Sequence, residues 1–111
     1  MTQNQPAEAD WKNYKSIVHG LRERYLNKRN TELIAILSRD SKTPTENFWD
    51  TSERMKEIER IMSDCLDDHR RSRMLSNLML MYYHEMISDD DLNVFSDEVR
   101  RRISTIVDIQ K

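Results

Sequence analysis

Apolar residues recur at steps of three and four along most of the chain, which is the period of an amphipathic α-helix. Over residues 7–27 this stripe consists of Trp11, Tyr14, Val18, Leu21 and Tyr25. A polar run at residues 27–30 interrupts the pattern, so we expect the first helix to end there. Residues 32–38 then predict a short second helix, which we expect to be buried because it is apolar all round.

The clearest helix start is the sequence Thr43-Pro44-Thr45-Glu46. It places a hydroxyl at the N-cap, proline at the first helical position and glutamate at the third, which is a capping-box pattern. We therefore expect a third helix to begin at Pro44. Its apolar stripe predicts a buried face that consists of Phe48, Met55, Ile58, Met62, Cys65, Leu66 and His69.

Seven consecutive polar residues, 67–73, separate this helix from an apolar segment at residues 74–87. If one helix ran straight through, the apolar faces on either side would differ in direction by roughly 130°. A break with a tight turn would let both faces meet one core, and we favour this interpretation. The run contains no Gly or Pro, so one long helix over residues 44–87 is the alternative.

Two more capping patterns follow, at Ser88 to Asp91 and at Ser96, and they predict a short helical turn and a last helix. That last helix carries a core stripe of Val99, Ile103, Ile106 and Val107. We therefore predict an all-α fold, a compact bundle of four to five helices in which helices three and four are antiparallel. Residues 1–6 are expected to be a disordered lead-in, and residues 7–111 a single domain.

Composition narrows the functional classes. With one Gly and two Pro in 111 residues, turn-rich β folds and Gly-rich phosphate loops are excluded. One Cys excludes an internal disulfide framework. The 18 basic and 20 acidic residues nearly balance, which excludes a polybasic protein but allows a local basic patch. A polar start and an apolar segment of only 14 residues predict a cytoplasmic protein without a membrane span.

Catalytic and metal-binding patterns are missing. Cys65 and His69 have the spacing of half a zinc site, but no second Cys/His pair completes it. No histidine has a Glu three residues before it, so the di-iron motif of helical bundles is absent. We therefore expect no enzyme, no cofactor and no metal site.

Several apolar residues are candidates for partner binding. Six of the seven methionines fall between Met55 and Met86, and clustered methionine is typical both of adaptable binding surfaces and of core. The wide apolar arc of residues 74–87 predicts a homodimer or an obligate partner, with Met79, Tyr83 and Met86 near the contact. Trp49 lies outside the stripe of its helix, as a partner anchor would, although packing against the first helix is equally compatible.

Two arginine clusters allow a different function. The residues concerned are Arg70, Arg71 and Arg73 in one cluster and Arg100, Arg101 and Arg102 in the other. Acidic residues precede both clusters, which favours a salt-bridged surface, although Arg100 has no acid at i−4 or i+4. The leading hypothesis is a non-enzymatic, cytosolic protein-interaction module, a small regulator or adaptor that self-associates. The alternative is a helical nucleic-acid-binding protein that uses these arginines.

One segment resembles a known family. Residues 58–74, IERIMSDCLDDHRRSRM, followed by ISDDDLNVF, are similar to the helical domain of the GINS replication-complex family. In that domain an Arg-rich stretch precedes an apolar helix and then a short helix with an acidic cap. The similarity covers less than half of the chain, and the small β-rich second domain usual in that family has no counterpart here. No residue role is carried over from it.

Overall fold

The computed structural model describes residues 6–110, with side chains for residues 6–105. In chain order its elements are α1 (Glu8–Leu37), α2 (Pro44–Leu66), the 3-10 helix η1 (Arg71–Arg73), α3 (Met74–Tyr83), the 3-10 helix η2 (Asp91–Val94) and α4 (Asp97–Gln110). No strand occurs within residues 6–110, and the helices pack against one another, so the all-α prediction is confirmed. Apart from Pro6, the predicted lead-in lies outside the described residues, as do the side chains of Ile106 and Val107.

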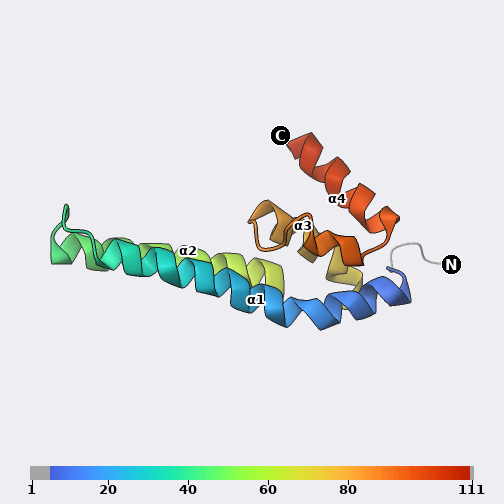
Figure 1. Cartoon of the computed structure of the whole chain (residues 1–111), viewed down its shortest axis with the longest axis horizontal. Helices are drawn as coiled ribbons and strands as arrows, with labels where there is room; N and C mark the ends of the chain where they lie inside the picture. Colours follow the sequence, from blue (N-terminus) through green and yellow to red (C-terminus); the bar gives the residue numbers. More distant parts are fainter. Residues whose placement is uncertain (1–5, 111) are drawn as a thin grey trace.

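Helices α1 and α2 form a long antiparallel hairpin, and α3 and α4 lie near one end of it (Figure 1). The molecule measures 59 × 28 × 22 Å, and its radius of gyration is 16.8 Å. A compact domain of this length has a radius of gyration of about 13 Å, so the structure is more elongated than predicted. The radius of gyration is larger because part of the hairpin, residues 27–55, projects from the rest of the molecule. We call this part the arm. The other described residues form the body.

The predicted interruption at residues 27–30 is wrong, because α1 runs through them without a break. Neither Gly nor Pro occurs there, and the lysine and arginine in the run are good helix formers. Thr31 lies within the helix, and its Oγ1 donates to the carbonyl oxygen of Asn27 (3.1 Å), one turn earlier. Polar residues at exposed positions therefore continue the helix rather than end it.

The burial predicted for the apolar residues of the arm is also largely wrong. In the segment 32–38 only Leu33 is buried, and on α2 Phe48 and Met55 are exposed. Two helices meet along a single line, so apolar residues on either side of that line stay exposed unless a third element covers them. In the arm no other described element lies on the hairpin (Figure 1).

The predicted start of α2 is confirmed, including its capping box. Thr43 Oγ1 accepts from the Glu46 backbone N–H (3.1 Å), and Glu46 Oε1 accepts from the Thr43 backbone N–H (3.0 Å). In the next position, the Asn47 amide donates to the carbonyl of Arg39 (2.9 Å) and accepts from its Nε (3.1 Å). These bonds satisfy the buried amide and close the turn between α1 and α2.

The favoured break between α2 and α3 is confirmed, and a single helix over residues 44–87 is wrong. The turn is held from inside the fold by Asn77 of α3, whose Nδ2 donates to the carbonyl of Asp68 (2.7 Å) and to the Tyr14 hydroxyl (3.1 Å). The turn lets α3 pack against α2, as the predicted pairing of these two helices requires. A buried side chain amide thus compensates for the absence of Gly and Pro in this turn.

Helix α3 ends earlier than the apolar segment 74–87, in a Schellman motif. The Met86 N–H donates to the Met81 carbonyl (2.7 Å), and the Glu85 N–H donates to the Tyr82 carbonyl (3.2 Å). Glu85 takes the left-handed position of this motif, with φ at 60°, where glycine is usual. The chain then leaves the helix axis and buries Met86 in the core.

The two later capping patterns are confirmed as well. Asp91 Oδ2 accepts from the Ser88 N–H (2.8 Å), and Ser88 Oγ accepts from the Asp91 N–H (3.2 Å). Ser96 Oγ accepts from the Val99 N–H (3.4 Å) at the start of α4. Asp10 of α1, which is 4% exposed, accepts in turn from both the N–H and the hydroxyl of Ser96 (2.8 Å each). The beginning of α1 is thereby fixed to the beginning of α4.

The core lies in the body, between α1, the end of α2, α3 and α4. Its most deeply buried side chains are Tyr14, Cys65, Met74, Leu78, Met81, Met86 and Ile103. The apolar arc of residues 74–87 is therefore covered largely by the chain itself, which removes the reason for expecting a partner on this segment.

Candidate interaction surface

Exposed apolar side chains gather on the arm. Among the described residues, seven large apolar side chains are exposed, and five of them belong to the arm: Ile34 (64%), Leu37 (52%), Phe48 (58%), Trp49 (61%) and Met55 (47%). The other two, Tyr83 and Val94, are in the body. The arm thus has an apolar surface that is not explained by its own packing.

Four of these side chains point to one side of the hairpin. At about 100° per residue, Leu37 and Ile34 lie about 40° and 100° around α1 from the buried Leu33. Met55 and Phe48 lie within about 90° of the buried line of α2, in the same rotational sense. Because the helices are antiparallel, the same sense of rotation leads to the same side of the hairpin. We call this surface, together with the adjacent Trp49, the arm face.

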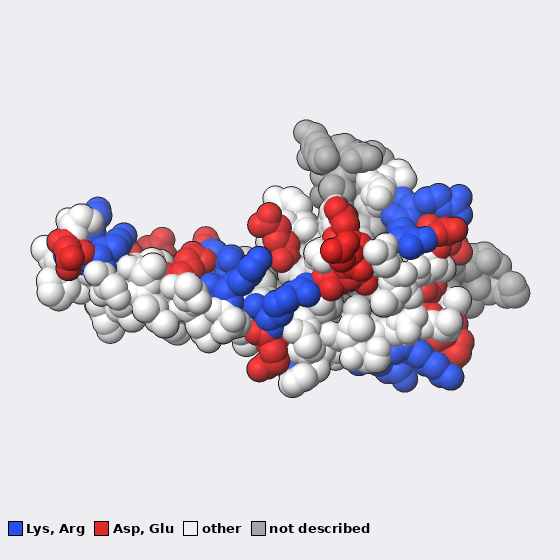
Figure 2. Space-filling model, in the orientation of Figure 1, with Lys and Arg blue, Asp and Glu red and all other residues white. Residues whose placement is uncertain are grey.

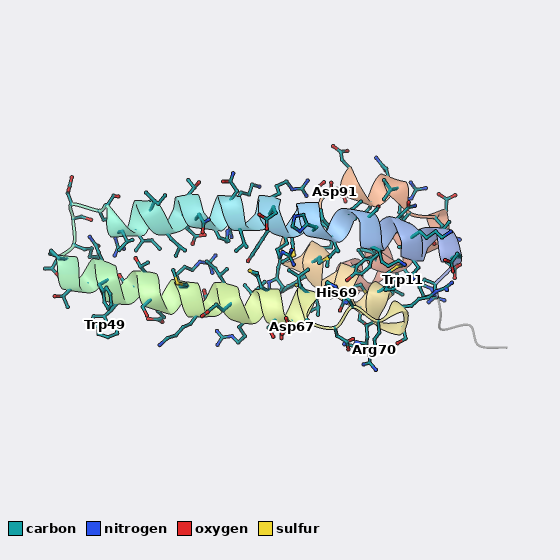
Figure 3. All side chains as sticks on the ribbon, turned by 90° about the horizontal axis from the view of Figure 1, so that it is seen from below. Trp11, Trp49, Asp67, His69, Arg70 and Asp91 are labelled. Carbon is teal, nitrogen blue, oxygen red and sulfur yellow. The ribbon has the colours of Figure 1, made fainter. Side chains whose placement is uncertain are left out.

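Trp49 extends the arm face around α2. Its ring meets the ring of Phe48 edge-to-face, with centroids 4.9 Å apart and an interplanar angle of 84°. Figure 3 shows Trp49 near the tip of the arm, on the side of α2 that is turned away from α1. It therefore does not pack against the first helix, which was the alternative interpretation.

No ionisable residue of the arm lies on the side to which Ile34, Leu37, Phe48 and Met55 point, whereas Trp49 lies one helical turn from Glu53. The polar residues that share that side are Asn27 and Asn30 on α1 and Thr45 and Ser52 on α2. Figure 2 shows uncharged surface along the lower edge of the arm. The centre of protein–protein interfaces is likewise depleted of charge and enriched in aromatic residues and methionine.

The opposite side of the arm is closed by ion pairs. The Arg54 guanidinium donates two hydrogen bonds to Glu32 (2.6 and 3.2 Å) and one to Glu57 (2.7 Å). Arg39, in the turn that follows α1, forms an ion pair with Asp50 of α2 (2.8 Å). The hydrogen bonds from Arg54 lower the pKa of Glu32 from its ordinary value. These charges are paired within the chain, so the arm has one charged side and one apolar side.

The sequence pattern singles out Trp49 as a partner anchor, but it predicts that most other residues of the arm face are buried in the core. One feature of the sequence does indicate an exposed apolar face: residues 33–37 are five consecutive apolar residues at the end of a helix. They surround the helix, and a hairpin buries only one line of positions. Some of them must then be exposed unless a third element is present.

The residues predicted near a dimer contact on segment 74–87 differ in burial. Met79 is partly buried against the core, and Met86 is 1% exposed. Tyr83 is 65% exposed and meets His84 edge-to-face, with ring centroids 5.0 Å apart. Of the three, only Tyr83 presents a large apolar surface, and it lies in the body, outside the arm face.

The first arginine cluster is paired with acids. Arg70 donates to Asp68 through Nε (2.9 Å) and a terminal nitrogen (2.8 Å), and Arg73 lies 3.7 Å from the same carboxylate. Arg71 pairs with Glu8 (2.9 Å) at the start of α1. The hydrogen bonds from Arg70 lower the pKa of Asp68.

In the second cluster, Arg100 and Arg102 pair with acidic side chains, and Arg101 donates to a backbone carbonyl. Arg100 pairs with Asp97, which lies at i−3, so the lack of an acid at i−4 and i+4 does not leave it without a partner. Arg102 is 3.4 Å from Glu98, and Arg101 donates from Nε to the backbone carbonyl of Asp97 (3.4 Å). Figure 2 shows basic and acidic groups side by side where these clusters are visible, with no continuous positive face in this view.

Cys65 and His69, which have the spacing of half a zinc site, belong to different segments of the chain. Helix α2 ends before His69, so Cys65 and His69 do not share a helical face. Cys65 is fully buried, and burial raises the pKa of its thiol to about 11. Within the described part of the chain, no group of three or more His, Cys, Asp or Glu side chains is placed to hold a metal ion. None of the helices in that part is long and apolar enough to cross a membrane.

Comparison of the chain with family models, with curated proteins and with solved structures gives no significant match. The similarity of residues 58–74 to the GINS helical domain therefore assigns no family.

Proposed function

We propose that this protein is a non-enzymatic, cytoplasmic protein-interaction module, a small regulator or adaptor, that docks through the arm face. The observation that carries the proposal is the clustering of five exposed apolar side chains, two of them aromatic, on one projecting hairpin. Contiguous exposed patches of this kind mark interaction sites in monomeric proteins. A tryptophan with a neighbouring phenylalanine is also the composition of an interface anchor.

The pairing of the arginines supports a protein partner over a nucleic acid. To bind a phosphate, Arg70, Arg71 or Arg100 would have to give up an acidic partner at 2.9 Å or less. Phosphate binding gains from charges that are free to replace counterions. We therefore expect no micromolar binding of a generic DNA or RNA duplex at low salt. Salt-sensitive binding that is lost when these three arginines are neutralised together would support the nucleic-acid alternative instead.

The proposal is tested by affinity purification of three tagged forms from the cells that express the protein. They are the wild type, Phe48→Asp on the arm face and Tyr83→Asp on the body. The two substituted residues are similarly exposed, at 58% and 65%, so both variants should fold and show the helical circular dichroism of the wild type. We expect quantitative mass spectrometry to find proteins that the Phe48→Asp form loses and the Tyr83→Asp form retains. The same set of proteins with all three forms would contradict docking at the arm face.

A further inference from the structure

The hairpin is covered by further helices at one end only. In the body, α3 packs against α2 and α4, and its Asn77 donates a hydrogen bond to Tyr14 of α1. In the arm, the buried residues are Leu33 on α1 with Asn47 and Thr51 on α2, and two of these three are polar. Two helices that share so small a core gain little from packing, and most helical stability in proteins comes from packing. The arm has the structure of half a four-helix bundle.

The charges of the arm indicate which surface fits it. The arm's acid–base pairs, among them Glu32 with Arg54 and Asp50 with Arg39, lie on the side away from the arm face. The arm face itself has polar residues that carry no charge, such as Asn30 and Ser52. A partner of strong opposite charge would find nothing to pair with there. An uncharged, apolar surface with amide and hydroxyl groups is the complement, and the arm face of another copy is such a surface.

The exposed apolar area of the arm face fits the centre of an interface. Aromatic side chains bury about 150–250 Å² each when fully covered, so Phe48 and Trp49, at 58% and 61% exposure, offer roughly 200–300 Å². The three aliphatic side chains bring the total to on the order of 500 Å². A stable interface buries about 800 Å² on each partner, with a polar rim around its apolar centre. The arm face with the asparagine, threonine and serine residues beside it matches one half of such an interface.

We propose that the occupant of the arm face is a second copy of this chain, and that two arms pair about a two-fold axis into an antiparallel four-helix bundle. The proposal rests on the proposed function, because it takes the arm face as the docking surface and names its partner. In two-fold symmetry the same patch lies on both sides of the interface, so an uncharged face meets an uncharged face. An axis perpendicular to the arms sends the two bodies to opposite ends of the bundle.

The test is the mass of the purified full chain by light scattering over the micromolar range. The wild type and Tyr83→Asp should have twice the 13.4 kDa of one chain. Phe48→Asp on α2 and Leu37→Asp on α1 should each have 13.4 kDa, because pairing would bury an unpaired carboxylate. We expect each arm variant to raise the dissociation constant by at least about a hundredfold, which corresponds to a loss of about 3 kcal/mol. Circular dichroism checks that both variants keep the wild-type helicity.

Two results would overturn the second copy as occupant. One is a wild type that remains at 13.4 kDa throughout the micromolar range. The other is a dimer that persists in Phe48→Asp and Leu37→Asp but dissociates in Tyr83→Asp, which would place the contact on the body. A monomer whose arm face still captures other proteins in the purification above would leave the proposed function intact with a different partner. A monomer that captures nothing through the arm face would count against both.

Discussion

Helices α1 and α2 run through both the arm and the body, but their residues are buried to different extents in the two regions. In the body, α1 contributes Tyr14 and Leu21 to a core that α3 and α4 close. In the arm, α1 contributes only Leu33, while Ile34 and Leu37 remain exposed. Apolar residues occur along α1 in both regions. Burial therefore depends on how many neighbouring elements reach a helix, and the helix's own apolar pattern does not contain this information.

The two regions also differ in the sequence separation of their polar contacts. In the body they join distant parts of the chain: Asp10 to Ser96 across 86 positions and Tyr14 to Asn77 across 63. In the arm the longest such contact, Glu32 to Arg54, spans 22 positions. The body is thus closed by contacts between its first and last helices, whereas the arm is a local hairpin. Substitutions in the two regions should therefore differ in their effect on stability.

The two regions should differ most in how much stability is lost when one leucine is replaced by alanine. Leu78→Ala removes a fully buried side chain of α3 and should lower the free energy of unfolding by about 2–5 kcal/mol. Leu37→Ala on the arm should change it by less than about 0.5 kcal/mol. Both are measured by urea unfolding in a Phe48→Asp background, so that pairing of arms does not contribute. Similar losses for the two substitutions would mean that the arm is packed as tightly as the body.

The same contrast explains how much could be predicted from the sequence. Caps at Thr43, Ser88 and Ser96 depend on residues within one turn, and all three were predicted correctly. The break after α2 followed from two apolar faces that point in different directions. The exposure of the arm could not be predicted, because it depends on which elements are absent from the neighbourhood. Asp10 was missed for the same reason, since its partner Ser96 is brought to it only by the fold.

The next effect concerns an ion pair of the body and its pH dependence. Arg24 donates to both oxygens of Asp91, and Ser88 donates to it through its N–H (2.8 Å) and hydroxyl (2.9 Å). These bonds, those from Arg24 above all, lower the pKa of Asp91 from 3.8 to about 2. A pKa that is lower in the folded state gives stability that is present above pH 3.8 and is lost as the pH falls towards 2.

We therefore expect Asp91→Asn to lower the free energy of unfolding by about 2 kcal/mol at neutral pH. The difference from the wild type should shrink below pH 3.8 and vanish near pH 2. Urea unfolding at several pH values measures it, with the neighbouring, exposed Asp90→Asn as the control. A difference that stays constant down to pH 2 would show that the carboxylate charge is not what stabilises this contact.

A smaller effect, of opposite sign, is expected at the end of α3. Glu85 has a φ of 60°, which is unfavourable for a residue with a Cβ atom. Glu85→Gly should raise the free energy of unfolding by about 1 kcal/mol, because glycine adopts this conformation without strain. Glu85→Ala is the matched control: it removes the carboxylate but keeps the Cβ, so it should give no such gain. A gain with alanine as large as with glycine would assign the effect to the charge and not to the backbone.

The smallest effect should be that of the ion pair in the arm. Glu32→Gln removes one charge of the pair with Arg54, whose two side chains are 35% and 25% exposed. Because the pair is partly exposed to water and joins residues that are close in sequence, we expect the free energy of unfolding to fall by only about 0.5–1 kcal/mol. Added salt should reduce this loss further. Glu53→Gln, at the exposed position just before Arg54, is the control and should have no measurable effect. Urea unfolding at low and high salt, in the Phe48→Asp background, gives both values. If Glu32→Gln lowers the free energy of unfolding as much as Asp91→Asn does, then a strong polar contact stabilises the arm. The arm would then not depend on a partner for its rigidity.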